Sequence, residues 1–339
     1  MVLAGFKWMF LIIGTMIGAG YASGREIWQF FSGESSLAIG LFALLFMVCL
    51  LVVMTLSYTM HTNDYIGVLE RIVGRRMSHV YDLLTVLYLF TTTGTMIAGG
   101  AAALEMFHLP YWAGILFISV MLVWVLRYDV EGVTSINVFM IPVLIVTLLI
   151  TLLMFQWSVG GSFQFEAVEL HSMSPVFVFT ALNLLPIVAV IAGVGSRIRS
   201  HGEIWIACCG SSLILGVVTY LYNESLLAVS DDVLLYEIPL FAILNAYPYV
   251  MVLFMTLLLW TAIFTTAATG LFGLVRRLRV VSPQPTSVLA VFSLLAMLPL
   301  AWIGFSTLVS TLYPIYGVIN LYLLAAVVLY PLLRRIGKK

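Results

Sequence analysis

Charged side chains are scarce in this chain. Lysine and arginine contribute 15 residues and aspartate and glutamate another 15, which is 9% of 339 residues, whereas a soluble domain carries about 25%. Hydrophobic residues make up 63% of the chain, and its mean hydropathy is +1.13. This composition excludes a soluble domain and predicts a membrane protein that crosses the lipid bilayer several times. No nucleic-acid partner is expected, since the formal net charge is zero.

Cysteine and the residues of catalytic sites are also few. The three cysteines, Cys49, Cys208 and Cys209, lie within hydrophobic segments, and no metal-ligand spacing joins them to histidine, so we expect them to pack as small residues. The hydrophobic segments hold no cluster of histidine with carboxylates, no nucleophile beside a base and no phosphate loop. We therefore expect neither an enzyme nor an organic cofactor. The first apolar run lacks a strongly basic start and a cleavage site, so it reads as a retained helix.

Hydrophobic runs long enough to span a bilayer dominate the sequence. A transmembrane helix needs about 20 apolar residues, and a window of that length finds ten segments. They cover residues 4–31, 35–60, 79–107, 110–127, 133–156, 172–196, 202–228, 247–275, 285–304 and 308–333. With the N-terminus inside, every lysine and arginine except Arg25 falls in a cytoplasmic terminus or loop, while carboxylates gather in the external loops. The asymmetry predicts an even number of spans with both termini cytoplasmic.

Glycines interrupt the first hydrophobic segment. Gly14, Gly18, Gly20 and Gly24 lie within it, and glycine resists helical ordering. We therefore expect the main chain to unwind at Gly18, Ala19 and Gly20. Unwound backbone at membrane depth is tolerated only where it is buried in protein or lines a watery cavity, so this stretch is a candidate binding site. The alternative is that glycines spaced four apart only let helices approach closely.

A second interruption lies in the sixth segment, where residues 179–186 include Asn183 and a proline that lacks a helical N–H. Each interruption opens a group of five segments, and an odd repeat must invert its second copy. We therefore expect an all-α membrane protein of ten transmembrane helices, with helices 1 and 6 discontinuous and with 5+5 inverted repeats at about 4–156 and 172–333. These repeats form one transmembrane transporter domain, residues 1–339. Asn183 could instead cap a half-helix or bond across helices.

With these features the chain resembles the leucine-transporter-like fold of the amino acid, polyamine and organocation transporter superfamily. The run Gly-Ala-Gly-Tyr-Ala-Ser-Gly-Arg-Glu-Ile at residues 18–27 is similar to that of bacterial YkvI-type membrane proteins. The resemblance covers all ten segments and is specific for the fold rather than for a substrate. It implies a multi-pass protein of the bacterial plasma membrane that moves a small solute.

The resemblance also implies a sodium site. In sodium-coupled members, carbonyls of the first helix, with a carbonyl and two hydroxyls of the eighth, surround one ion. Matched to this sequence, the ligands are the carbonyls of Gly14, Ile17 and Ala262 and the hydroxyls of Thr265 and Thr266. A hard cation prefers oxygen ligands, and the i, i+3, i+4 spacing puts the last three on one helical face. Alternatively, both threonines could bond to carbonyls of their own helix.

The sequence departs from the sodium-coupled neurotransmitter-transporter pattern at two positions. Tyr21 stands where that family has an asparagine that helps to bind a second sodium, so a single sodium is expected. The basic gate residue of that family aligns with Gly24, which leaves Arg25 one position away. Adjacent helical residues face different sides, so Arg25 and Glu26 cannot satisfy one another. We expect them to form a gate or carry a proton, unless both lie high enough to meet external water.

The predicted function is secondary active transport of a small solute, an amino acid or related amine, coupled to sodium by alternating access. The predicted substrate site consists of Gly18, Ala19, Gly20, Tyr21, Thr91, Asn183 and Leu184. Amides of the unwound stretch would hold an anionic group. Asp82 and Glu105 are assigned to contact with water, and residues 229–246 to a lid over an external entrance. Proton coupling is one alternative, and a non-transporting receptor, resembling spore germinant-receptor B subunits, is another. The oligomeric state stays open.

Overall fold

The computed structural model describes residues 2–125, 130–160 and 174–336. These residues form helices and connecting turns, and none of them lies in a strand. Within the described ranges, seven helices are long and apolar enough to cross a membrane, and three shorter apolar helices accompany them. Each hydrophobic segment read from the sequence coincides with one of these helices. The prediction of an all-α membrane protein is confirmed.

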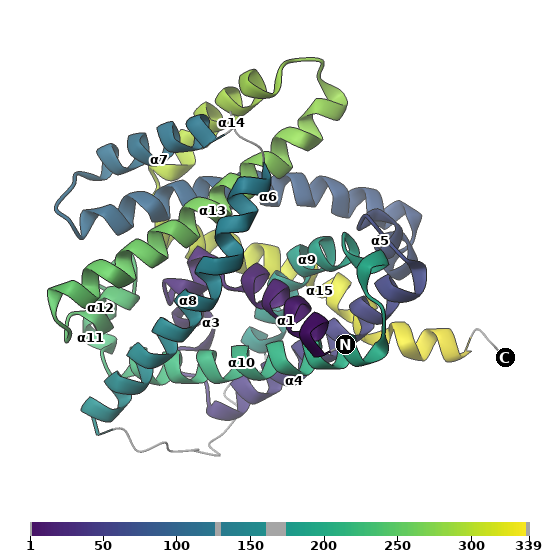
Figure 1. The fold of residues 1–339 in the computed structure, drawn as a ribbon, viewed down its shortest axis with the longest axis horizontal. Helices are drawn as coiled ribbons and strands as arrows, with labels where there is room; N and C mark the ends of the chain where they lie inside the picture. Colours follow the sequence, from purple (N-terminus) through teal and green to yellow (C-terminus); the bar gives the residue numbers. More distant parts are fainter. Residues whose placement is uncertain (1, 126–129, 161–173, 337–339) are drawn as a thin grey trace.

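The helices follow one another along the whole chain (Figure 1). In order they are α1 (Val2–Met16), α2 (Ala19–Ala22), α3 (Arg25–Phe31), α4 (Ser36–Met60), α5 (Ile66–Val73), α6 (Arg75–Glu105), α7 (Tyr111–Val125), α8 (Val130–Ser158), α9 (Ser174–Ala192), the 3-10 helix η1 (Gly195–Arg197), α10 (His201–Leu227), α11 (Ser230–Val233), α12 (Leu240–Leu244), α13 (Tyr249–Val281), α14 (Thr286–Ala301) and α15 (Phe305–Ile336).

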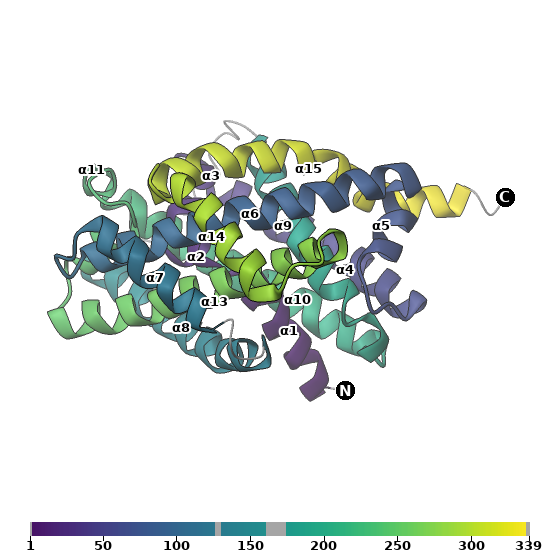
Figure 2. The same ribbon diagram turned by 90° about the horizontal axis from the view of Figure 1, so that it is seen from above.

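The two ends of the molecule differ in charge. The short helices α11 and α12 lie at one end, and α5 lies at the other, with the C-terminus (Figures 1 and 2). We call the first the acidic end, after Asp231, Asp232 and Glu237, and the second the basic end, after Arg71 and the neighbouring arginines at the start of α6.

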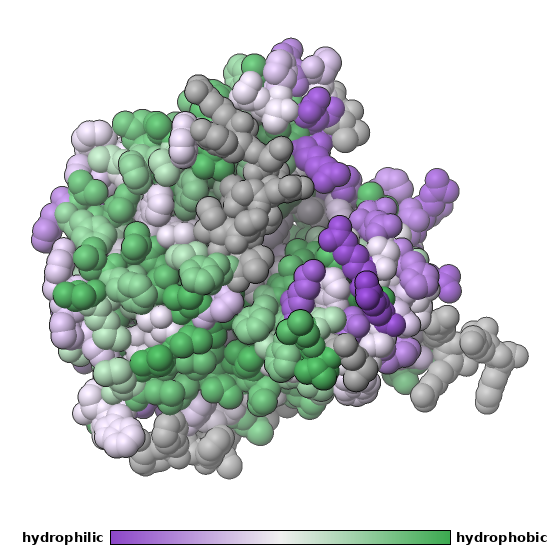
Figure 3. All heavy atoms as spheres, in the orientation of Figure 1, coloured by the Kyte–Doolittle hydropathy of each residue, from purple (hydrophilic) through white to green (hydrophobic). Residues whose placement is uncertain are grey.

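The surface between these ends is apolar. Figure 3 shows a broad hydrophobic face, with hydrophilic residues gathered toward the side of the basic end. Large apolar side chains point outward from several spans, among them Trp157 at 89% exposed, Leu213 at 68% and Phe292 at 67%. Since water penalises such exposure and lipid does not, this face is suited to the hydrocarbon region of a bilayer.

The packing of the first five spans recurs among the last five. Helix α1 packs on α10 as α9 packs on α4, and α6 packs on α7 as α13 packs on α14. Helix α8 packs on α13 as α15 packs on α6. In each case both helices of a pair are replaced by their counterparts in the other half, five spans away in the chain. The long helices α6 and α13 also pack on each other.

The first span is broken where the sequence predicted. Helix α1 ends at Met16, and α2 begins at Ala19 after Ile17 and Gly18. A second interruption at Gly24, whose φ of 79° is a left-handed conformation that favours glycine, separates α2 from α3. The predicted unwinding is confirmed at Gly18, whereas Ala19 and Gly20, which were also expected to unwind, lie in the short helix α2.

The predicted break in the sixth span is wrong. Helix α9 continues from Ser174 to Ala192 through Asn183 and Pro186. An interior proline removes one helical hydrogen bond, which a helix can survive with a local bend. The Asn183 side chain donates to the Phe179 carbonyl at 3.0 Å, so its amide is satisfied within the same helix.

Irregular backbone follows α9 instead of interrupting it. The Ser196 N–H donates to the Thr62 carbonyl at 2.9 Å, which ties η1 to the segment after α4. A Cβ at Gly195 would lie 2.6 Å from the Ser57 carbonyl oxygen, so glycine is required for this approach. The irregular stretch of the second half therefore lies beside the end of α4.

Candidate functional site

The break between α1 and α2 frees backbone groups. The Gly18 N–H donates to the Met16 carbonyl at 2.9 Å and the Ile17 N–H to the Ile13 carbonyl at 2.7 Å. The Gly14 carbonyl therefore loses the donor, Gly18, that a continuous helix would supply. A freed carbonyl inside a membrane protein needs another partner, which can be a cation.

Helix α13 lies directly beside this break. A Cβ at Gly18 would be 4.0 Å from Cγ2 of Thr266, which is ordinary contact. The Thr265 and Thr266 hydroxyls donate to the Ala262 carbonyl at 3.1 and 2.8 Å. This is the back-bonding that the sequence left open as an alternative, and it still leaves lone pairs on both hydroxyl oxygens. These oxygens are of the kind that a sodium ion prefers, and ion binding at them stays a prediction.

Glu26 lies on the other side of the break. Its residue is only 6% exposed, and its Oε2 has no hydrogen-bond partner among the described residues. The carboxylate packs so closely on Gly20 that a Cβ there would clash with Oε1. Glu26 therefore faces the broken segment rather than external water, and the interpretation that it lies in water does not apply.

Arg25 faces the acidic end. Glu237, between α11 and α12, is close enough to stabilise the positive charge of Arg25, and its Oε2 accepts the Ser306 N–H at 2.6 Å. The Leu240 N–H donates to the Ser23 carbonyl at 2.9 Å, so the segment with α12 sits on the turn that follows α2. Arg25 and Glu26 thus face different parts of the protein, as expected for adjacent residues of one helix, α3.

Several predicted substrate contacts have partners within the protein. The buried Tyr21 hydroxyl is 3.0 Å from the Leu215 carbonyl and 2.8 Å from Thr219 Oγ1, so this side chain packs against α10. Thr91 Oγ1 is 2.8 Å from the Tyr316 hydroxyl, which joins α6 to α15. Leu184 is fully buried in α9. Tyr21 is therefore more a packing residue than a surface for a solute.

Sequence reasoning missed the tyrosines around Glu26. Tyr88 on α6 and Tyr313 on α15 both lie within reach of the Glu26 charge. The Tyr88 and Tyr316 rings meet edge to face at 5.3 Å between centroids. No local pattern marks these tyrosines, because they come from spans far apart in the sequence.

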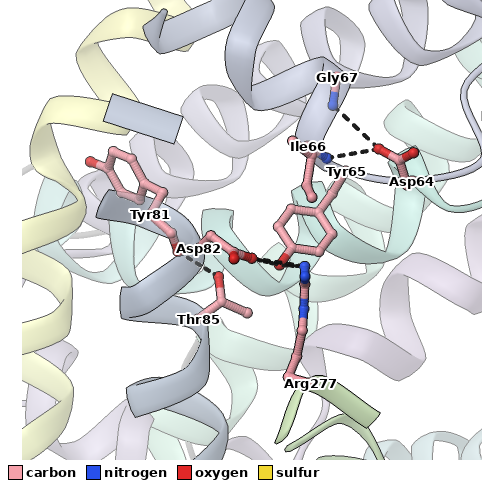
Figure 4. Close-up of polar contacts among 8 residues, drawn as sticks. All are labelled: Asp64, Tyr65, Ile66, Gly67, Tyr81, Asp82, Thr85 and Arg277. Carbon is pink, nitrogen blue, oxygen red and sulfur yellow. Dashed lines mark hydrogen bonds and ion pairs between the residues drawn. The ribbon is translucent and has the colours of Figure 1, made fainter. Parts of the chain in front are cut away.

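A polar cluster at the basic end was also missed. The Arg277 guanidinium on α13 lies 2.8 Å from Asp82 on α6, and the Tyr65 hydroxyl donates to Asp82 at 2.5 Å (Figure 4). Arg277 also donates to the Tyr65 hydroxyl and lies 5.1 Å from the centre of its ring. Burial, with the hydrogen bond to Asp82, raises the pKa of Tyr65 to about 12. Asp82 thus has protein partners in addition to its predicted contact with water, and Glu105 is exposed.

A cavity of about 520 Å³ opens near the start of α1. Trp8 and Lys7 of α1, the basic residues Arg197 and Arg199, and Glu203 of α10 contribute to its lining. The Trp8 indole N–H donates to Glu203 at 3.1 Å. This bond joins α1 to α10 on the N-terminal side of the break.

Two bacterial relatives match this chain over nearly its full length, while no family model matches it. YyaD of Bacillus subtilis (strain 168), an uncharacterized protein, is 43% identical over 332 residues, which is 98% of this chain and 98% of that protein. YkvI, an uncharacterized membrane protein of the same bacterium, is 25% identical over 331 residues, covering 94% of this chain and 93% of YkvI.

Solved transporters have a similar fold. The inward-facing structure of Mhp1 matches with a TM-score of 0.66 at 15% identity, covering 96% of this chain and 75% of that one. A manganese transporter of Eremococcus coleocola gives 0.64 at 16% identity, with 97% and 78% covered. A Na⁺-coupled sialic acid symporter in a substrate-bound outward-open state gives 0.63 at 14% identity, with 94% and 77% covered. The leucine-transporter-like fold expected from the sequence is confirmed.

Proposed function

We propose that this chain, which belongs to the family of the YyaD and YkvI membrane proteins, is a secondary active transporter of a small solute. The observation that carries the proposal is the broken first span, which places freed backbone and the buried carboxylate of Glu26 between α13 and the tyrosines of α6 and α15. Irregular backbone inside a helical membrane protein is typical of a transporter binding site. The solute is an amino acid or a related amine, moved by alternating access.

The two halves are inverted repeats of five transmembrane helices, and both termini lie in the cytoplasm of a bacterial cell. The exchange of packing partners between the halves supports the repeats. The basic end then faces the cytoplasm, in agreement with the preference of arginine and lysine for that side. The acidic end, with its lid of α11 and α12, faces outward.

Sodium transport is coupled to solute transport through an ion site, which is formed by the oxygens of Gly14, Ile17, Ala262, Thr265 and Thr266. The contact of Gly18 with Thr266 and the freed Gly14 carbonyl support this assignment. A bound sodium ion supplies a positive charge that draws the broken span and α13 together. Its electrochemical gradient supplies the driving force.

The solute lies against the break and the start of α2, with Gly18, Ala19 and Gly20 on one side and Thr91, Asn183 and Leu184 on the others. Arg25 and Glu237 close the route from the acidic end, because they hold the lid segment over α3. Proton coupling is the second candidate mechanism, and the observation that favours it is the buried Glu26 carboxyl, whose Oε2 has no hydrogen-bond partner among the described residues.

Solid-supported membrane electrophysiology on proteoliposomes tests the function, because coupled transport moves charge even when the substrate is one member of a mixture. Pools of amino acids and amines are applied under a sodium gradient, under a proton gradient and under neither. We expect a current that needs both a pool and the sodium gradient. Absence of any gradient-driven current with all pools contradicts transport, and a current driven only by protons replaces sodium as the coupling ion.

A further inference from the structure

The Glu26 carboxylate is buried without a counter-charge. None of the ion pairs found among the described residues involves it, and the neighbouring Arg25 lies near Glu237 instead. A carboxylate enclosed in this way is costly unless a cation or several hydrogen bonds accompany it. Among the described residues, the site therefore lacks a positive partner for Glu26.

Two tyrosines of other helices lie within reach of the Glu26 charge, Tyr88 of α6 and Tyr313 of α15. Both are neutral and have electron-rich rings. Aromatic faces attract ammonium groups, and phenolic oxygens accept hydrogen bonds from them. A buried carboxylate with these tyrosines nearby is thus complementary to an organic cation and not to an anion.

The position of the carboxylate links it to the solute site. Glu26 packs on Gly20, in the short helix α2 directly after the break, and Thr91 lies one helical turn after Tyr88 on α6. A cation that pairs with Glu26 would therefore contact both the break and the α6 face that includes Thr91. An anionic group placed at Gly20 would instead meet a like charge.

We propose that Glu26 is the specificity-determining residue of the site, and that its carboxylate binds a primary ammonium group of the solute. This inference rests on the proposed function and narrows it, because it assigns the Gly20 side of the break to the cationic end of the solute. An amino acid fits if its ammonium group points to Glu26, and a diamine fits as well.

Thermal unfolding of the purified protein with matched probes tests the proposal. Putrescine, butane-1,4-diol and succinate share a four-carbon chain and differ in charge, and lysine, norleucine and glutamate extend the comparison to amino acids. We expect the probes that carry an ammonium group, either on the carbon chain or as an accessible amine, to stabilise the wild type. The stabilisation should be seen in a medium where N-methylglucamine replaces sodium and again in sodium. Glu26→Gln should weaken the affinity about tenfold or more, as loss of a charged hydrogen bond does.

Two further variants separate binding from folding. Glu26→Asp keeps the charge and should retain part of the affinity. Glu105→Gln removes an exposed carboxylate from the acidic end of α6 and should leave binding unchanged. If Glu26→Gln unfolds, the comparison of Glu26→Asp with wild type still tests the dependence on carboxylate position.

Three results of the binding experiments, and one of the transport experiment, overturn the inference. The first is that no ammonium probe stabilises the wild type. The second is equal stabilisation of wild type and Glu26→Gln by the same probe. The third is loss of sodium-dependent stabilisation in Glu26→Gln with ammonium binding intact, which assigns the carboxylate to the coupling ion. Gradient-driven currents that persist in Glu26→Gln would overturn the inference and leave transport standing, whereas Glu26-dependent binding without any current would do the reverse.

Discussion

Arg277 and Asp82 form an ion pair of 2.8 Å that joins the basic end of α13 to α6, and Tyr65 bonds to both partners. The three residues come from α13, α6 and the segment before α5, so the cluster joins these three elements at the basic end (Figure 4). In the proposed orientation this is the cytoplasmic side.

We expect Asp82→Asn to loosen the basic end with little loss of stability. The pair is partly exposed, at 29% for Arg277 and 37% for Asp82, and such pairs contribute about 0–1 kcal/mol. Hydrogen exchange in residues 61–74 should become faster. Arg276→Lys, at the exposed neighbouring position, is the control, and unchanged exchange in Asp82→Asn would show that the cluster does not restrain this end.

Loss of either threonine hydroxyl should abolish stabilisation by sodium. Thr265→Ala and Thr266→Ala each remove one proposed ligand, and the bonds that are lost lie within α13. A ligand at 100 times its Kd stabilises by about 2.7 kcal/mol, which thermal unfolding in sodium and N-methylglucamine chloride can resolve. Thr269→Ala, one turn further along, is the control. Equal stabilisation by sodium in wild type and both variants rules this site out.

Gly20→Ala should destabilise the protein by about 1–3 kcal/mol, because the added methyl group would overlap the Glu26 carboxylate. Gly18→Ala is the matched control, since its methyl group would make only ordinary contact with Thr266. The double change Gly20→Ala with Glu26→Ala should recover part of the loss in a double-mutant cycle. Additive effects of the two changes would mean that Gly20 and Glu26 are not in contact.

Glu237→Gln should loosen the lid at the acidic end. The amide can still accept the Ser306 N–H, but it loses the charge that faces Arg25. Hydrogen exchange or limited proteolysis of residues 229–246 should become faster, while the spans remain protected. Asp231→Asn changes an exposed carboxylate of the same segment and is the control. A lid unaffected by Glu237→Gln is held by backbone contacts such as that of Leu240 with Ser23 alone.

The spans were predictable because each is a long apolar run whose length is set by the bilayer. The break at Gly18 was predictable because glycines are concentrated there. The break expected at Pro186 was not found, since a proline removes one hydrogen bond and Asn183 satisfies its amide at Phe179. From the sequence alone, an asparagine that bonds within its own helix cannot be distinguished from one that contacts a ligand.

The site itself was predictable only in part. The interruption identified the segment that contains Gly18 and Glu26, but not the residues of other helices that face this segment. Tyr313 lies 287 residues beyond Glu26 by sequence number, and Arg277 lies 195 beyond Asp82, so only the folded chain reveals these neighbours. Single tyrosines and arginines near span ends are too common for their pairing to be inferred from spacing.

The unequal continuity of the first span and α9 makes the two halves mechanically different. At residues 17–18 and at Gly24 the chain can bend between helices, with α2 moving as a unit, whereas bending α9 would strain the hydrogen bonds on either side of Pro186. The first span of one half can therefore bend at two positions, whereas its counterpart in the other half, α9, is a continuous helix. Outward and inward opening need not be mirror images of one motion, and the barrier between them should depend mainly on the two joints at Gly18 and Gly24.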